Sequence, residues 1–271
     1  RMGKRARVHL ELETGLNRTG LRKEELLLCK RFLDDHPDDI RIEGVCTHYA
    51  GAESIANYLR VQNQMVLFGE LCGYLDEMGV SYGSKHTACS AAAIRYPATV
   101  MDMVRFGIAQ YGFWPTREVR MDYVLKETDA GHDSSHDPLK RILTWKSRIM
   151  SIKDVNLGQF VGYGNSYLTT RRQRIATIPV GYFHGFTRQL SNLGHVLIQG
   201  RRCPVVGVVN MNLMQVDVTD TREAAIGDEV VILGKQRKAE ISVGSFSDLT
   251  RVLNYEVLVR IPSEIPRVVV R

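Results

Sequence analysis

Residues 7–50, "RVHLELETGLNRTGLRKEELLLCKRFLDDHPDDIRIEGVCTHYA", alternate strand and helix patterns. Residues 7–13 have the short apolar pattern of a strand, and in residues 22–35 the apolar side chains fall mostly on one helical face. Residues 42–50 repeat the strand pattern. Strand, helix and strand at this spacing predict parallel strands joined by right-handed crossovers.

The same alternation continues along the chain. A long amphipathic helix is predicted over residues 53–79, a third strand over 82–89 with a short helix from Ser90, and a fourth strand over 103–109. A complete eight-stranded α/β barrel takes about 250 residues, so four such units are about half of one. Half a barrel has unpaired edges. We therefore expect residues 1–113 to be the C-terminal half of a barrel whose N-terminal half lies outside this chain.

The pattern changes after residue 113. Residues 114–141 form a polar, turn-rich connector that includes "KETDAGHDSSHDP". Residues 142–271 contain short strand patterns separated by Gly, Asn and Asp turns, which predict an all-β C-terminal domain, either a barrel or a sandwich. The expected strands lie within residues 145–155, 158–164, 174–182, 195–200, 203–210, 214–220 and 228–234.

Composition narrows the class of protein. With 271 residues, 44% hydrophobic and 24% charged, the chain is globular. The net charge is +6, but the basic residues are scattered, so no nucleic-acid partner is predicted. Five cysteines without CxxC spacing argue against disulfides or a zinc ribbon and favour a reducing compartment. The two histidines of "HDSSHD", residues 132–137, lie on an acidic connector, and no metal site is predicted there.

The compartment is predicted less directly. No apolar run approaches the roughly 20 residues of a membrane span, and no secretory signal is visible. The chain starts with arginine and enters a strand almost at once, so we expect a processed or partial product. A cytoplasmic location is expected, with a periplasmic or membrane-tethered form if the upstream sequence carries a signal.

Polar side chains follow each predicted parallel strand. They are Arg18, His48, His86 with Ser90, and Arg105 with Gly107. One such residue alone is usually structural, but parallel α/β folds gather functional groups at the C-terminal ends of their strands. A serine that opens a helix and a glycine that lets backbone approach a ligand together suggest a phosphate site.

Seven segments, in order, resemble the motifs of alanine racemases and of related broad-specificity amino-acid racemases. They are "HLELETGLNRTG", "GVCTHYAGAES", "SKHTACSAA", "DMVRFGIAQYG", "VGYGNSY", "IATIPVGYFHGFTR" and "VVGVVNMNLMQVDVTD". The resemblance runs from Val8 to Arg267. It implies a pyridoxal 5'-phosphate enzyme with an α/β barrel followed by a β-domain. The implied reaction is racemisation of L-alanine to D-alanine for peptidoglycan, with serine or basic amino acids as alternative substrates.

The resemblance also implies roles at the cofactor. Arg105 matches an arginine that faces the pyridine nitrogen. A permanent charge there keeps that nitrogen unprotonated and weakens the ring as an electron sink, which favours racemisation over transamination. His48 and His86 match the histidines that hold this arginine and couple it to a catalytic tyrosine. The phosphate contacts are matched by Ser90, Gly107 and Ile108.

Further roles fall on the β-domain and the first strand. Tyr163 matches the catalytic tyrosine, whose phenol, with a usual pKa near 10, needs cationic neighbours to act as a base. In the family this tyrosine reaches the barrel of the other subunit, which implies a homodimer with shared active sites. Tyr182 and Met211 match residues at the substrate entrance and carboxylate site. Arg18 matches an arginine near the cofactor hydroxyl and the substrate carboxylate, often oriented by a carbamylated lysine whose place Glu11 occupies here.

The sequence departs from the family in four places. Ser263 replaces a phosphate-binding tyrosine and Asn212 an acidic residue, as in the broad-specificity branch, and His184 replaces an aspartate with no assignable effect. No "KANAYG"-like segment with a cofactor-binding lysine is found. Of the ten lysines only Lys85 is near a strand end, and it matches no family lysine. We therefore expect the chain alone to be inactive until the missing half is supplied, on the same polypeptide or as a separate chain.

Two alternatives stay open. Basic amino-acid decarboxylases have a related architecture, but they place an acidic residue against the pyridine nitrogen and carry a glycine-rich phosphate loop; Arg105 and the lack of that loop disfavour them. A regulatory or interaction module that kept the barrel surface and lost the chemistry is the non-enzymatic alternative. A lysine-bearing segment upstream would discriminate between enzyme and module.

Overall fold

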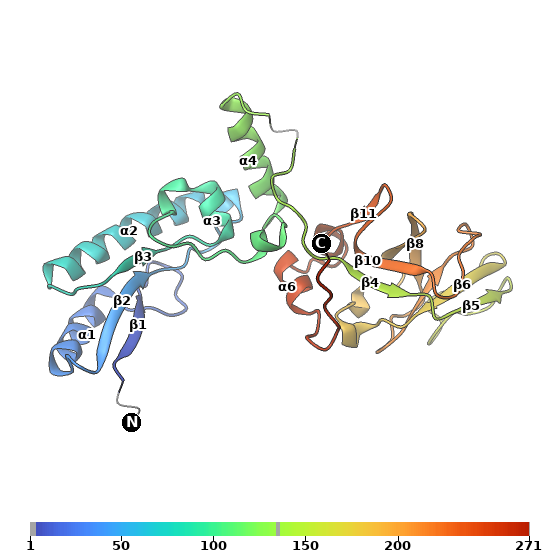
Figure 1. Cartoon of the computed structure of the whole chain (residues 1–271), viewed down its shortest axis with the longest axis horizontal. Coiled ribbons are helices and arrows are strands. Elements are labelled where there is room, and N and C mark those ends of the chain that lie inside the picture. The colour runs from blue at the N-terminus through green and yellow to red at the C-terminus, as the bar shows by residue number, and fades with distance from the viewer. Residues whose placement is uncertain (1–3, 134–135, 271) are drawn as a thin grey trace. The chain divides into compact units, whose positions relative to one another are not determined.

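The computed structural model describes residues 4–133 and 136–270. The chain forms two compact units, Arg1–Lys140 and Arg141–Arg271, which are described separately (Figure 1). We call them unit 1 and unit 2. Ser134 and Ser135 of the "HDSSHD" segment lie outside the described residues.

Unit 1 is built on three parallel strands. They are β1 (Ala6–Glu11), β2 (Ile40–Cys46) and β3 (Ser84–His86), in the order β1-β2-β3. The connecting helices are α1 (Lys23–Asp35) and α2 (Tyr58–Glu77), with a short 3₁₀ turn at Ile55–Asn57. These elements confirm the strand–helix alternation predicted over residues 7–89. The spacing of the apolar residues is sufficient to distinguish strands from amphipathic helices in this region.

The predicted fourth strand is wrong. Among the described residues, 103–109 form only an isolated parallel bridge, between Cys89 and Arg105. The chain leaves the extended conformation at Gly107, whose N–H is bonded to the Ser90 hydroxyl rather than to a strand, and a 3₁₀ turn follows at Ile108–Tyr111. The apolar run at residues 103–109 therefore ends at the edge of the sheet and does not add a strand to it.

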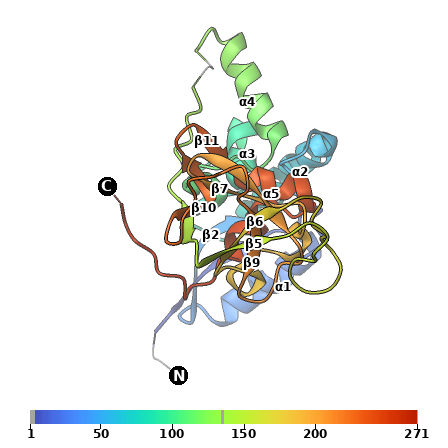
Figure 2. The ribbon, with the colours of Figure 1, turned by 90° about the vertical axis from the view of Figure 1, so that its right-hand side faces the viewer.

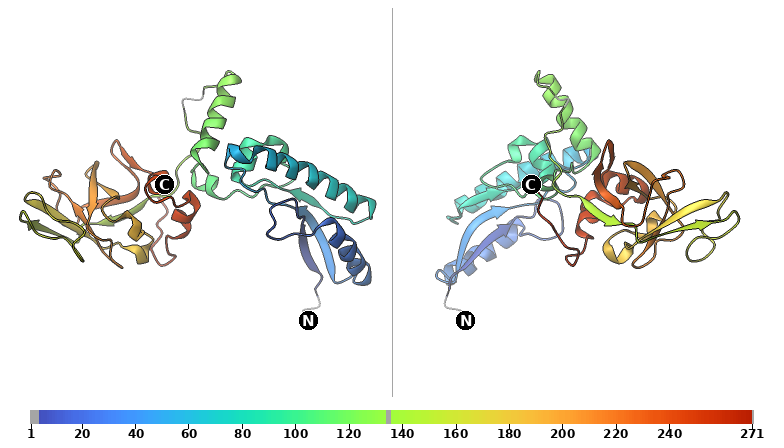
Figure 3. Two further views of the ribbon diagram at one scale, coloured as in Figure 1. Left: turned by 180° about the vertical axis from the view of Figure 1, so that it is seen from behind. Right: turned by 45° about the vertical axis from the view of Figure 1, so that its right-hand side comes forward.

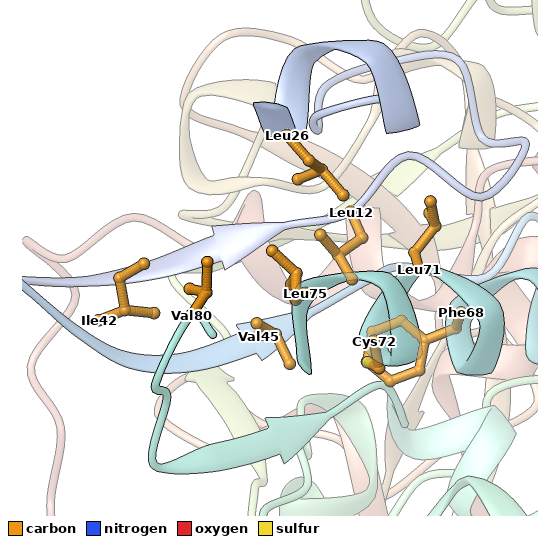
Figure 4. Close-up of a cluster of buried hydrophobic side chains, with 9 residues drawn as sticks. All are labelled: Leu12, Leu26, Ile42, Val45, Phe68, Leu71, Cys72, Leu75 and Val80. Carbon is orange, nitrogen blue, oxygen red and sulfur yellow. The ribbon is translucent and has the colours of Figure 1, made fainter. Parts of the chain in front are cut away.

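The core of unit 1 lies between the strands and their helices. Figure 4 shows its nine buried side chains, Leu12, Leu26, Ile42, Val45, Phe68, Leu71, Cys72, Leu75 and Val80. The α2 members recur at intervals of three or four residues, so they lie on one helical face. The apolar side of the sheet is covered in this way, and the alternate side chains of β1, Arg7, His9 and Glu11, are left for the other side.

Gly44 allows the strands of unit 1 to approach closely. A Cβ atom there would lie 2.5 Å from the Ser84 carbonyl oxygen and 2.7 Å from His9 Nδ1. The pairing of β1 with β2 also shifts by one residue between Val8 and His9. The missing side chain and the shift together leave space in which side chains of β1 and β3 meet across β2.

A helix lies within the predicted connector. The next helix after α3 (Ser90–Arg95) is α4 (Arg117–Asp129). Its N-cap is Thr116, whose hydroxyl accepts the Val119 N–H at 3.3 Å. Val119 is fully buried in a second core cluster, whereas much of the helix is exposed and projects away from the sheet of unit 1 (Figure 3). The exposed helix has little amphipathic pattern, so no periodicity was present from which to predict it.

Unit 2, several of whose strands are labelled in Figure 2, is an antiparallel β-structure with two added helices. The sheet order is β11-β10-β7-β8-β9-β6-β5, and β4 pairs with β10. Its strands are β4 (Trp145–Arg148), β5 (Ser151–Val155), β6 (Gln173–Ile178), β7 (His195–Ile198), β8 (Arg201–Val206), β9 (Met214–Asp217), β10 (Glu229–Gln236) and β11 (Ala239–Ile241).

Two expectations for unit 2 need correction. Residues 158–164 form no strand in the part of the chain that is described; they belong to a loop, residues 156–169, closed by an isolated bridge between Phe160 and Leu168. We call it the Tyr163 loop. The domain is also not all-β, because α5 (Val243–Thr250) and α6 (Asn254–Val259) follow the last strand. Across residues 4–133 and 136–270, no helix has the length and apolar character needed to cross a membrane.

Candidate active site

Arg105 lies where two parallel strands end. Its guanidinium donates to the carbonyl oxygens of Thr47, His86 and Thr87 at 2.7, 2.9 and 3.0 Å. Thr47 directly follows β2 and Thr87 directly follows β3. A planar cation with five N–H donors matches this group of acceptors, which explains why an arginine follows an apolar run. The guanidinium is thus held rigidly at the C-terminal edge of the sheet.

His86 connects Arg105 to His9, which was not predicted from the sequence as a site residue. Arg105 donates to His86 Nδ1 at 2.5 Å, and His86 Nε2 lies 2.9 Å from His9 Nδ1. An arginine can only donate, so His86 Nδ1 accepts and its Nε2–H donates to His9. Burial lowers the pKa of His86 to about 4, with Arg105 and His9 adding to the effect. His86 is therefore neutral near pH 7. His9 lies on the side of β1 opposite its core-facing residues and is exposed, so the local apolar pattern did not indicate it.

His48 and Arg18 lie at the same edge. His48 Nδ1 is 3.5 Å from the Arg105 guanidinium, and its pKa is lowered first by burial and then by Arg105 and Arg18. Arg18 forms an ion pair with Glu11 at 3.9 Å. The Thr19 hydroxyl donates to the same carboxylate at 2.7 Å. Glu11 therefore faces Arg18, as expected if it substitutes for an anion that orients this arginine.

The three residues expected at the phosphate lie next to one another. The Ser90 hydroxyl accepts the Gly107 N–H at 2.9 Å, which fixes the start of α3 against the turn that begins at Ile108. Ser90 and Ile108 are 1% and 2% exposed. Because the Ser90 oxygen accepts this bond, its own hydrogen remains a donor for an anion. Ser90 is the first residue of α3 and not its N-cap, which is Cys89.

In unit 2, Tyr163 is at the tip of its loop and is 73% exposed. Gly162 and Gly164 flank it with φ values of 76° and 69°, where glycine is favoured. The segments that carry Tyr182 and Met211 are bonded to each other. The Tyr182 N–H donates to the Asn210 carbonyl at 3.0 Å, and the Phe183 N–H to that of Met211 at 3.0 Å.

The departures from the family pattern have different structural outcomes. His184 Nδ1 accepts the Gly181 N–H at 3.2 Å, which assigns a local capping role to this residue. Asn212 and Ser263 are exposed, and nothing in the structure explains these two substitutions. The Lys85 ammonium is 5.5 Å from the centre of the Tyr82 ring. Among the described residues, no hydrogen bond or ion pair joins a lysine to Arg105. Within those residues, no group of three or more potential metal ligands is found.

The pKa of His86 predicts a pH dependence of stability. Its folded value of about 4 is below the usual 6.5, so the unfolded state binds more protons between these values. The free energy of unfolding should therefore decrease as the pH falls from about 6.5 to about 4. Urea denaturation measures this slope, which His86→Gln should reduce. His132→Gln, on an exposed turn, is the control, and an equal slope in wild type and His86→Gln would contradict the prediction.

Family comparisons agree with this two-unit plan. The family model "Alanine racemase, N-terminal domain" matches residues 1–115, and "Alanine racemase, C-terminal domain" matches residues 142–269. The alanine racemase of Symbiobacterium thermophilum is 39% identical over 98% of this chain and 67% of its own length. That of Halothermothrix orenii is 35% identical over 96% of this chain and 65% of its own.

Solved structures show the same fold. The alanine racemase from Bacillus anthracis with bound L-Ala-P superposes with a TM-score of 0.87 and 30% identity, covering 98% of this chain and 65% of that one. The enzyme from D-cycloserine producing Streptomyces lavendulae gives 0.86 and 28%, covering 98% and 66%.

The fold and site define a barrel-type unit with a strand-end arginine, joined to an antiparallel β-domain. The chain belongs to the alanine racemase family, whose cofactor is pyridoxal phosphate. It spans about two thirds of the length of the relatives it matches, 67% and 65% for the two above. The comparisons do not support the expectation that the N-terminal barrel region is absent, because the N-terminal family model itself matches residues 1–115.

Proposed function

We propose that this chain supplies the cofactor and proton-transfer residues of an amino-acid racemase, with L-alanine and D-alanine as the first substrate pair. The observation that carries the proposal is the Arg105 guanidinium, held by three strand-end carbonyls and a neutral His86. Pyridoxal phosphate, when bound, acidifies the Cα–H bond of the amino acid. The chain would hold its pyridine nitrogen with Arg105 and its phosphate with Ser90, Gly107 and Ile108. Arg105 supplies the charge, the Ser90 hydroxyl keeps its hydrogen as a donor, and the Gly107 N–H is already bonded to Ser90.

Arg105 also separates this proposal from a decarboxylase. A guanidinium stays protonated at any physiological pH, so it can donate a hydrogen bond to the ring nitrogen but not a proton. A decarboxylase needs an acidic residue in this place. His86 is neutral and accepts a hydrogen bond from Arg105, so the positive charge beside the ring nitrogen is that of the guanidinium. This arrangement favours reprotonation at Cα over other outcomes.

Tyr163 is proposed to hold or move the proton on one face of Cα. Its exposed phenol on a folded loop suits contact with a second copy of the chain, so a homodimer with shared sites is proposed. Tyr182 and Met211 would line the entrance beside it. Arg18, oriented by Glu11, would bind the substrate carboxylate. Serine and basic amino acids remain the alternative substrates, and the D-amino acid would serve peptidoglycan synthesis in the cytoplasm.

The proposal also includes two statements that rest on the lysines of the chain. Residues 1–113 are the second half of a barrel, and the isolated chain is inactive. Two-base racemisation needs a lysine at the cofactor. In the part of the chain that the structure describes, no hydrogen bond or ion pair joins a lysine to Arg105. The same observation favours the interaction module as the second candidate, because a module would need no lysine.

A comparison of two proteins tests the proposal. The 271-residue chain, mixed with pyridoxal phosphate and L-Ala, L-Ser, L-Lys or L-Arg, is expected to give no D-amino acid by chiral chromatography. A fusion with the part of the Symbiobacterium relative that the match leaves uncovered is expected to bind the cofactor, seen by visible absorbance, and to racemise. Racemisation by the chain alone contradicts the lysine requirement. A folded fusion that binds no cofactor supports the interaction module.

A further inference from the structure

We propose that Asn192 is a positioning residue for Tyr163, an inference that rests on the proposed function of Tyr163 in proton transfer. Asn192 lies between a 3₁₀ turn at Arg188–Leu190 and β7. Its side-chain Nδ2 donates to the Ser166 carbonyl at 3.0 Å, and its Oδ1 accepts the Gly207 N–H at 2.7 Å. One side chain therefore joins the Tyr163 loop to the residue that follows β8.

The backbone of Asn192 suits this role. Its φ is 57°, in the left-handed region that asparagine adopts more readily than most residues other than glycine. Gly207, which it contacts, has a φ of 75°, and a Cβ there would lie 2.6 Å from the Val161 carbonyl oxygen. The segment after β8 thus passes directly against the base of the Tyr163 loop, and Asn192 bonds to both of them.

The base of the Tyr163 loop is well fixed without Asn192. Val161 is 5% exposed and packs with Ile175 and Val206, and its N–H donates to the Tyr167 carbonyl at 3.0 Å. The Thr169 hydroxyl donates to the Asn156 carbonyl at 2.6 Å, at the other end of the loop. These contacts close the loop but leave its tip, residues 162–166, outside the buried cluster.

The tip needs a separate restraint. Two of its residues are glycines, which have the greatest backbone freedom to lose on ordering, and Tyr163 itself is mostly exposed. Among the hydrogen bonds that the structure describes, the bond from Asn192 to Ser166 is the one that reaches the tip from outside the loop. Asn192 therefore limits the positions that the Tyr163 phenol can take, and a displacement of about 1 Å at a reacting group can cost about 10²-fold in rate.

The neighbouring residue offers a matched control. The Ser191 hydroxyl accepts the Val209 N–H at 3.0 Å and donates to the Arg188 carbonyl at 2.6 Å. It restrains the segment that carries Met211 and has no described bond to the Tyr163 loop. Loss of the Ser191 hydroxyl should therefore loosen only the segment after β8. Loss of the Asn192 side chain should loosen both that segment and the Tyr163 loop.

Hydrogen exchange of the 271-residue chain, followed by mass spectrometry, tests the inference. Asn192→Gly keeps the left-handed backbone and removes both side-chain bonds, so amides of residues 160–167 and of Gly207 should exchange about tenfold faster or more. Asn192→Asp keeps the acceptor and loses the donor, so Gly207 should stay protected while residues 160–167 exchange faster. Ser191→Ala should affect Val209 alone. Gln199→Gly, at another left-handed position (φ 52°) bonded to Glu223 and Asp228, should change neither segment.

Two results would overturn the inference. One is exchange of residues 160–167 within twofold of wild type in Asn192→Gly, whatever happens at Gly207. The other comes from the racemising fusion, where Asn192→Gly should lower kcat about tenfold or more with KM within twofold of wild type; a raised KM with unchanged kcat contradicts a positioning role. If the wild-type fusion does not racemise, the proposed function fails, and the exchange data still decide whether Asn192 holds the loop.

Discussion

Replacing Tyr163 with phenylalanine is expected to lower kcat for racemisation in the fusion by about 10²–10⁴-fold, the usual contribution of a positioned acid or base. The free energy of unfolding should stay within about 0.5 kcal/mol of wild type, because a side chain that is 73% exposed contributes little to packing. Racemisation rates from the L and the D enantiomer, together with urea denaturation, measure both effects.

Tyr167 provides the matched control in the same loop. Its hydroxyl accepts a hydrogen bond from Gln173 Nε2 at 2.8 Å, so Tyr167→Phe should cost about 1 kcal/mol of stability and leave most of kcat. Each variant removes one phenolic oxygen, but only one of the two phenols is proposed to reach the substrate. Equal losses of kcat in the two variants would mean that loop integrity, and not the Tyr163 phenol, limits the rate.

Replacing Arg105 with alanine is expected to lower the free energy of unfolding by about 2–4 kcal/mol, because three strand-end carbonyls lose their donor. It should also raise the pKa of His86 from about 4 toward 6.5, since Arg105 is one cause of the low value. Arg105→Lys should rescue little, because an ammonium cannot match the planar array of acceptors. Urea denaturation and NMR titration of His86 measure these changes, and the fusion should lose at least about 10² in kcat.

An exposed arginine separates these effects from a loss of positive charge alone. Arg120 lies on the exposed side of α4, so Arg120→Ala should leave the stability of the chain and the His86 pKa near their wild-type values. An unchanged His86 pKa in Arg105→Ala would show that burial and His9 set it without Arg105. Unchanged stability would show that water replaces the guanidinium at the carbonyls without cost.

Much of the fold could be predicted from local sequence. The strands and helices up to His86 follow from periodicity, because each buries one face and so repeats its apolar residues at a fixed spacing. Six of the seven segments predicted as strands in unit 2 contain strands for the same reason. The fourth strand of unit 1 could not be predicted correctly, because whether residues 103–109 extend or turn depends on the bond from Gly107 to Ser90.

The sequence by itself determined the class of fold and the family, and it predicted most of the candidate site residues, since these depend on residue types in a fixed order along the chain. The tertiary structure alone decided how those residues act together. His9 and His86 are 77 positions apart and meet only because Gly44 leaves room between them. The low pKa of His86 follows from burial and then from Arg105 and His9, its tautomer follows from the bond with Arg105, and none of these has a signal in the local sequence.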